Sequence, residues 1–152
     1  MHCATIMTLN PKTVTENETI GHAADQILAH SAIDVLVVDA EGRLAGLFGI
    51  YDLLALLVPR VALIGDLVPN LRFMDDDIGA LHTRFTELRD VPVRRAANRE
   101  PATVFPDTPI IEAIRLFCHN HMTIPVVERE TRRLAGIISY WDATRAIMKP
   151  AQ

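Results

Sequence analysis

Hydrophobic positions along the first third of the chain follow a fixed order of spacings. A β-branched segment at 12–15 ("KTVT") precedes apolar residues at helical spacing over 20–28. The apolar runs "VLVV" at 35–38 and "LAGLFGI" at 44–50 then predict two buried strands with a glycine-containing turn between them. A further apolar helix is expected to begin near Asp52. The pattern predicts a β-α-β-β-α unit.

The same order of elements returns ninety residues later. Residues 101–143 align with residues 11–53 without a gap, and most identities fall at apolar, glycine or proline positions. Self-similarity at a fixed offset indicates one structural unit used twice. We expect side-chain caps for the first helix of each copy at Asn17 and Asp107. In the second copy we expect an extended segment at 102–105, strands at 124–127 and 134–140, and a last helix over 141–148.

A segment without a counterpart separates the two copies. It begins with acidic residues that suit a helix N-terminus, and its apolar residues form one stripe. We interpret it as an inserted amphipathic helix that covers an edge of the core; a helix that binds a partner is the alternative. The predicted domains are a first repeat (1–58), an inserted linker (59–90) and a second repeat (91–149). The residues of the stripe are Ile78, Leu81, Phe85 and Leu88.

Composition narrows the class of protein. The 152 residues are 49% hydrophobic and 22% charged, as in folded domains rather than disordered chains. The net charge of −4 and the scattered basic residues give no broad surface for nucleic acid. No apolar run approaches the roughly 20 residues of a membrane span, and the N-terminus does not resemble a signal peptide. We therefore expect a cytoplasmic protein without a membrane segment.

The sequence gives little support for a metal site or a disulfide. Cys3 and Cys118 lie outside any CxxC spacing, so we expect free thiols. Cys118, His119 and His121 are possible ligands, but side chains two positions apart on a helix do not face each other. No glycine-rich phosphate loop or GxSxG element is present. We expect no metal site, no catalytic residues and no enzymatic activity.

Several motifs, in the same order in both copies, carry a resemblance to a known family. In the second copy they are "ATVFPDTPIIEAI", "MTIPVV" and "LAGIISYWDA", and in the first copy "KTVTENETIGHAA", "DVLVVDAEG" and "LAGLFGIYDL". This arrangement resembles the tandem CBS-domain module, or Bateman module, named after the cystathionine β-synthase domain. The resemblance implies an α/β (α+β) fold in which two β-α-β-β-α repeats pack through their sheets as a pseudo-twofold pair.

The resemblance also implies a function. Such pairs commonly form disc-like homodimers and bind adenosine-containing ligands, such as AMP, ADP, ATP, NAD or S-adenosylmethionine, in clefts between the repeats. They usually sense a signal and regulate another protein rather than catalyse. We therefore expect an adenine nucleotide as a regulatory ligand, no catalytic cofactor, and an unknown regulated partner in trans. The alternative is a ligand-free dimerisation or protein-interaction module.

The second copy retains the family's frame of glycine, hydroxyl residue and aspartate. The resemblance assigns the carboxylate of Asp142 to a ribose diol and the hydroxyl of Ser139 to ribose or phosphate, beside a helix N-terminus that favours an anion. The alternative is that Asp142 caps the last helix and Ser139 ends a strand. The resemblance places the stronger nucleotide site at Thr103, Val104, Ile124, Pro125, Val126, Gly136, Ser139 and Asp142.

The first copy departs from the frame. Gly49 replaces the hydroxyl residue, and in the gapless alignment Val35 replaces the proline and Asp34 stands opposite Ile124. A lost neutral hydrogen bond typically costs about 0.5–1.5 kcal/mol. The first site is therefore expected to be weaker or empty. Its residues are Thr13, Val14, Asp34, Val35, Gly49 and Asp52.

Overall fold

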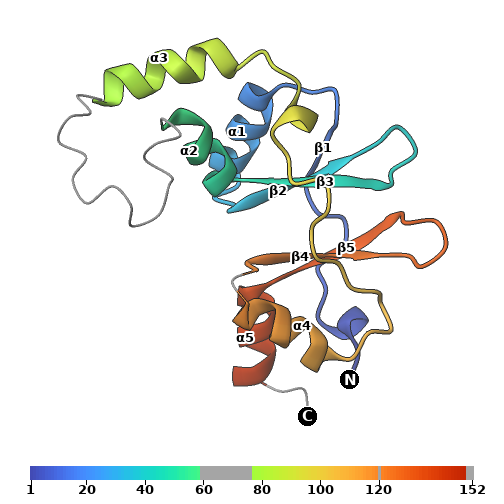
Figure 1. Cartoon of the computed structure of the whole chain (residues 1–152). Helices are drawn as coiled ribbons and strands as arrows, with labels where there is room; N and C mark the ends of the chain where they lie inside the picture. The colour runs from blue at the N-terminus through green and yellow to red at the C-terminus, as the bar shows by residue number, and fades with distance from the viewer. Residues whose placement is uncertain (59–76, 120, 150–152) are drawn as a thin grey trace.

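Each repeat forms a small sheet with its helices on the outer side, and the two sheets face each other (Figure 1). The computed structural model describes residues 1–58, 77–119 and 121–149. The remaining part of the expected insert, 59–76, lies outside the described residues. The elements are the 3₁₀ turn η1 (Cys3–Thr5), β1 (Thr13–Thr15), α1 (Ile20–Ala29), β2 (Asp34–Val38), β3 (Leu44–Gly49), α2 (Ile50–Leu57), α3 (Ile78–Leu88), the 3₁₀ turn η4 (Val93–Arg95), α4 (Ile110–Cys118), β4 (Thr123–Val127), β5 (Leu134–Ser139) and α5 (Tyr140–Met148).

The two sheets differ in their first strand. In the first repeat β1 pairs with β2 in parallel, and β2 pairs with β3 antiparallel. In the second repeat β4 and β5 form an antiparallel pair, but the strand expected at 102–105 is reduced to one parallel bridge between Val104 and Val126. Pro101 and Pro106 flank this segment and have no N–H to donate to a ladder. The prediction of a regular strand here was wrong.

The cap expected at Asn17 lies two residues further on. The Thr19 hydroxyl accepts a 3.1 Å hydrogen bond from the His22 backbone N–H and caps α1. The Asn17 side chain instead accepts a 2.6 Å hydrogen bond from Arg94, which lies in the leading segment of the second repeat. Asn17 therefore ties the two repeats together instead of capping a helix.

The cap expected at Asp107 is also absent. α4 begins after Pro109, and no side chain caps it. Asp107 forms a 2.8 Å ion pair with Arg129, and this hydrogen bond is the main reason that the pKa of Asp107 is lowered. Both partners are exposed, so the pair contributes little to stability.

Each repeat has its own apolar core, and each core is completed by the leading segment of the other repeat. Val93 of η4 is fully buried against α1 and β2 of the first repeat. Cys3 of η1 is fully buried in the second repeat. Short antiparallel bridges hold both segments: Thr8 pairs with Ile137, and Asn98 with Leu47. The repeats therefore exchange their leading segments and are interlocked.

A third cluster joins the two sheets. Leu36, Leu44 and Val127 are buried where the sheets face each other. The hairpin tips also meet, because the Leu44 N–H donates to the Arg132 carbonyl and the Leu134 N–H donates to the Gly42 carbonyl, both at 3.2 Å. These two bonds are related by the pseudo-twofold axis.

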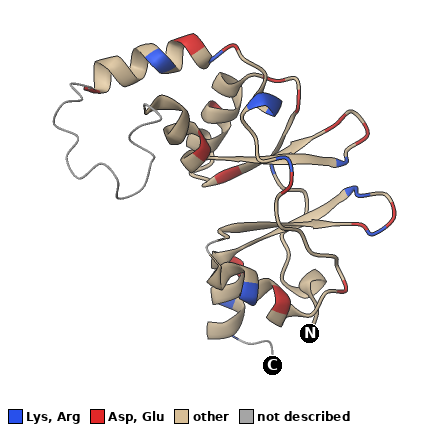
Figure 2. Ribbon diagram, in the orientation of Figure 1, with Lys and Arg blue, Asp and Glu red and all other residues tan. Residues whose placement is uncertain are grey.

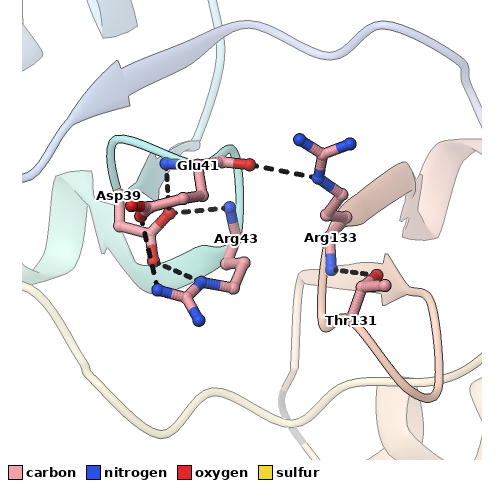
Figure 3. A network of polar contacts seen from close by, with 5 residues as sticks. All are labelled: Asp39, Glu41, Arg43, Thr131 and Arg133. Atoms are coloured by element: carbon pink, nitrogen blue, oxygen red, sulfur yellow. Dashed lines mark hydrogen bonds and ion pairs between the residues drawn. The ribbon is translucent and has the colours of Figure 1, made fainter.

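The hairpin tips carry a network of polar contacts (Figure 3). Arg43 pairs with Asp39 at 2.8 Å within its own turn. Arg133 crosses to the other repeat and donates to the Glu41 carbonyl at 3.2 Å. Acidic and basic residues are interspersed around both tips, so neither tip forms a surface of one charge (Figure 2).

The helix expected within 59–90 is present as α3, at the outer edge of the first repeat (Figure 1). Phe85 packs against the first core, and the Arg84 guanidinium donates to the Leu57 carbonyl at 2.9 Å. The expected stripe is only partly buried, because Ile78 is 80% exposed. Leu28, expected on the apolar face of α1, is also exposed.

Candidate ligand cleft between the repeats

The register of the strands changes which residues of the two repeats are equivalent. Asp34 lies directly opposite Gly49, whereas Thr123 lies opposite Ser139. Gly49 and Ser139 begin equivalent helices, so the counterpart of Asp34 is Thr123. In the same way, Leu36 opposite Leu47 matches Pro125 opposite Ile137. The gapless alignments of Asp34 with Ile124 and of Val35 with Pro125 were wrong by one residue.

Two compensating length differences cause this shift. α1 has ten residues and α4 has nine. The hairpin turn of the first repeat closes between Asp39 and Arg43, whereas that of the second closes between Glu128 and Arg133 and is one residue longer. Equivalent residues are again ninety positions apart after the turn. Because the sequences match on both sides of β2 and β4, the one-residue shift within these strands is not visible in the alignment.

Asp34 occupies the space that a side chain at position 49 would need. A Cβ atom added to Gly49 would overlap Asp34 Oδ1. The first repeat therefore replaces the Thr–Ser pair of the second repeat with an Asp–Gly pair. Burial raises the pKa of Asp34, interaction with the Thr123 hydroxyl lowers it, and the negative charge of Asp52 raises it further.

This raised pKa predicts a pH-dependent gain from Asp34→Asn. Because the folded state binds the Asp34 proton more tightly than the unfolded chain, ionisation of Asp34 reduces stability as the pH rises above the ordinary pKa of an aspartate. At pH 7.5 we expect urea unfolding to show that Asp34→Asn is more stable than wild type. A parallel thermal melt should show a melting temperature a few °C higher. The gain should shrink as the pH is lowered and wild-type Asp34 becomes protonated. A difference that does not depend on pH would contradict this account.

Asp34 also lines two adjoining cavities between the repeats. The first, of about 200 Å³, is bordered by Thr8, Lys12 and His30, and the second, of about 180 Å³, by Thr123, Ser139 and Trp141. The cavities share Ala32, Asp34 and Ile137, and we refer to them together as the Asp34 cleft. The cleft is built by the end of α1 and the start of β2 from one repeat, and by the end of β5 and the start of α5 from the other.

The start of α5 supplies a hydroxyl and a carboxylate that are hydrogen-bonded to each other. Asp142 Oδ2 accepts from the Ser139 N–H and from the Ser139 hydroxyl, each at 2.8 Å. The Asp142 N–H in turn donates to the Ser139 oxygen at 3.2 Å. The capping alternative considered from the sequence is therefore present. Asp142 Oδ1 has one weak partner among the described residues, Arg145 at 3.5 Å, and can accept further bonds.

A neighbouring cavity of about 330 Å³ gives access to Asp142. Arg145, Ala146 and Lys149 follow Asp142 along one face of α5, and Ile6 closes the other side. In the first repeat Asp52 accepts from the Gly49 N–H at 2.7 Å, and no hydroxyl joins this bond. The position equivalent to Arg145 is Ala55. The two repeats therefore offer unequal groups at their helix starts, with the richer set in the second.

Other residues of the stronger predicted site lie elsewhere. Val104, Ile124 and Val126 are buried in the second core, and Pro125 is fully buried. Thr103 lines none of the cavities described above. The structure therefore does not bring these residues together with Ser139, which instead shares the Asp34 cleft with residues of the first repeat.

Gly136 has a structural reason to be glycine. A Cβ atom there would lie 2.8 Å from the Thr8 carbonyl oxygen and 3.0 Å from the Met7 sulfur. Gly46 meets the Asn98 carbonyl oxygen in the same way, at 2.9 Å. The missing side chain of this glycine thus leaves room for the backbone of the exchanged leading segment.

Residues of the weaker predicted site are also divided between core and cleft. Val14 and Val35 are buried in the first core, although Val35 also borders the cavity of about 200 Å³. Thr13 is exposed on β1. Sequence reasoning missed Thr8, Lys12, His30 and Thr123 as cleft residues. Thr8 and Lys12 reach the cleft because the leading segments are exchanged, which places the start of the first repeat beside β5 of the second.

A separate cavity of about 520 Å³ lies on the helical side of the pair. Tyr51 of α2, Phe117 of α4 and Tyr140 of α5 line it, with His121 and Met122. Large apolar side chains nearby on α2 and α5 are exposed among the described residues. They include Tyr51, Leu54, Trp141, Ile147 and Met148.

Comparison with known proteins agrees with this architecture. The model of the CBS domain matches residues 3–59 and again 75–149. The chain belongs to the CBS-domain family. The sequence-based fold, a pseudo-twofold pair of β-α-β-β-α repeats, is thereby confirmed at the level of the CBS pair. No curated protein matches the sequence.

Solved structures of other CBS-domain proteins have the same fold. CBSX2 in complex with AMP is 21% identical with a TM-score of 0.72, and the match covers 97% of this chain and 96% of that one. A CBS-domain protein of unknown function from Bacillus anthracis is 14% identical, with a TM-score of 0.77 and coverage of 99% and 95%. The CBS pair of MJ0100, in complex with 5′-methylthioadenosine and S-adenosylmethionine, is 20% identical, with a TM-score of 0.66 and coverage of 97% and 99%. None of the helices in the described part of the chain is both long and apolar enough to span a bilayer.

Proposed function

We propose that this CBS-domain pair is a regulatory module that binds an adenosine-containing ligand in the Asp34 cleft, at the start of α5. The observation that carries the proposal is that the cleft is lined by both repeats and by Ser139, whose hydroxyl donates to Asp142 in the neighbouring cavity of about 330 Å³. The ligands named for CBSX2 and MJ0100 all contain adenosine, which supports this ligand class.

The chemistry of the cleft and of the neighbouring Asp142 cavity suits a nucleoside. Asp142 Oδ1 can accept hydrogen bonds from a ribose diol, because Oδ2 is already held by Ser139. Ile137 and Trp141 offer apolar and aromatic surface to a base. The first cavity adds a polar rim at Lys12 and His30. We assign the chain's own residues to binding alone and propose no catalytic step.

Binding would be transmitted through the geometry of the pair. A ligand that contacts both repeats favours the relative orientation in which those contacts are best, and so shifts the population toward it. We propose that a partner protein in trans reads this shift in the cytoplasm. The exposed apolar side chains of α2 and α5 support a homodimer through these helices.

The test is calorimetric titration of purified protein from which nucleotides have been removed. AMP, ATP, NAD, S-adenosylmethionine and 5′-methylthioadenosine are titrated in turn, and sedimentation equilibrium gives the oligomeric state. We expect saturable binding of at least one compound at one site per chain. A ligand at 100 times its Kd should stabilise the protein by about 2.7 kcal/mol, which a thermal melt will show. No heat and no thermal shift with any compound would favour the ligand-free interaction module.

A further inference from the structure

Asp34 is the acidic side chain common to both cavities of the Asp34 cleft. Its carboxylate is held over Gly49, where a side chain at that position would displace it. The equivalent position in the second repeat is the neutral Thr123. Charge at this point of the cleft is therefore a property of the first repeat alone.

The negative charge of Asp34 is not neutralised by a neighbour. Among the described residues, no lysine, arginine or histidine forms an ion pair with it. The charged group that influences the Asp34 carboxylate is Asp52, which is also acidic and raises the pKa of Asp34. Lys12 and His30 border the first cavity of the cleft, but both are exposed. Solvent therefore screens charge on these side chains more than it screens the charge of the half-buried Asp34 carboxylate.

The size of the cleft makes this charge relevant to any occupant. The cavities of about 200 and 180 Å³ are small, so the 5′-phosphate of a nucleotide bound there is expected within about one Debye length, roughly 8 Å, of the carboxylate. Like charges at this distance repel, and twice as strongly for a dianionic phosphate as for a single charge. A neutral or cationic 5′ substituent avoids this repulsion.

We propose that Asp34 is a selectivity residue that makes the cleft prefer adenosine derivatives with a neutral or cationic 5′ group over those with a 5′-phosphate. This inference rests on the proposed function, since it concerns the same cleft. It predicts that the signal is a nucleoside, thioether or sulfonium rather than a nucleotide.

The experiment measures the ratio of two affinities. Adenosine, S-adenosylmethionine and AMP are titrated at pH 8 and physiological salt into wild-type protein and into Asp34→Asn. Wild-type protein is expected to bind adenosine and S-adenosylmethionine at least about tenfold more tightly than AMP. In Asp34→Asn the ratio of AMP affinity to S-adenosylmethionine affinity should rise about tenfold or more. Asp34→Thr, which introduces the residue of the second repeat, should act in the same direction and serves if Asp34→Asn does not fold.

Asp25→Asn is the matched control, because it makes the same chemical change at an exposed position of α1 that borders neither cavity of the cleft. It should change the ratio less than twofold. The proposal is overturned if wild-type protein binds AMP as tightly as adenosine, or if Asp25→Asn changes the ratio as much as Asp34→Asn. Adenosine compounds that bind without discrimination would leave the proposed function standing, whereas no binding by any compound would overturn both.

Discussion

A Gly136→Ala variant is expected to be less stable than wild type by about 1–3 kcal/mol, the usual effect of forcing an extra group into a packed site. The added Cβ would lie 2.8 Å from the Thr8 carbonyl oxygen. That oxygen cannot move away easily, because it accepts from the Ile137 N–H at 3.0 Å while the Thr8 N–H donates to the Ile137 carbonyl at 2.8 Å. Thermal unfolding should shift down by roughly 2–4 °C for each kcal/mol lost.

The loss should be localised at the exchanged segment. Hydrogen exchange at the amides of Thr8 and Ile137 is expected to accelerate more than exchange within α1. Gly46→Ala should behave similarly, since its Cβ would lie 2.9 Å from the Asn98 carbonyl oxygen. Gly42→Asn is the control, because no atom lies within 4 Å of a Cβ there and asparagine tolerates its φ of 78°. If Gly136→Ala is as stable as Gly42→Asn, the close approach of Thr8 does not require glycine.

Most elements could be predicted from periodicity because each buries one face. In α1, Ile20, Ala23 and Ile27 are buried at helical spacing, and β2 and β4 are apolar throughout their central positions. Helix starts were less predictable. Several polar side chains near a helix start can serve as caps. Asn17 and Asp107 instead accept hydrogen bonds from Arg94 and Arg129.

The residues of the cleft were less predictable than the fold, for two physical reasons. The leading segments are exchanged, so Thr8 of the first copy lies on β5 of the second. The strands are also shifted by one residue between copies, and a shift of one residue moves a side chain to the other face of a sheet. Asp34 could therefore be identified as an unusual residue from the sequence, but its partner Gly49 and its place in the cleft required the structure.

Asp142→Ala is expected to weaken ligand binding by at least about tenfold while the protein stays folded. Hydrogen bonds to a charged group are typically worth about 1.5–3 kcal/mol each, and Asp142 Oδ1 is the acceptor proposed for the ribose diol. The same substitution removes the cap of α5, in which Oδ2 accepts from the Ser139 N–H and hydroxyl. Cap loss typically costs about 0.5–2 kcal/mol, so a lower melting temperature is expected as well.

Asp77→Ala separates the two effects. Asp77 caps α3 by accepting from the Ala80 N–H at 2.9 Å, and it borders none of the cavities of the candidate site. It should reduce stability by a comparable amount and leave the affinity measured by titration within about twofold of wild type. Equal losses of affinity in Asp77→Ala and Asp142→Ala would mean that binding responds to global stability, and Asp142 would then be a helix cap with no direct contact to the ligand.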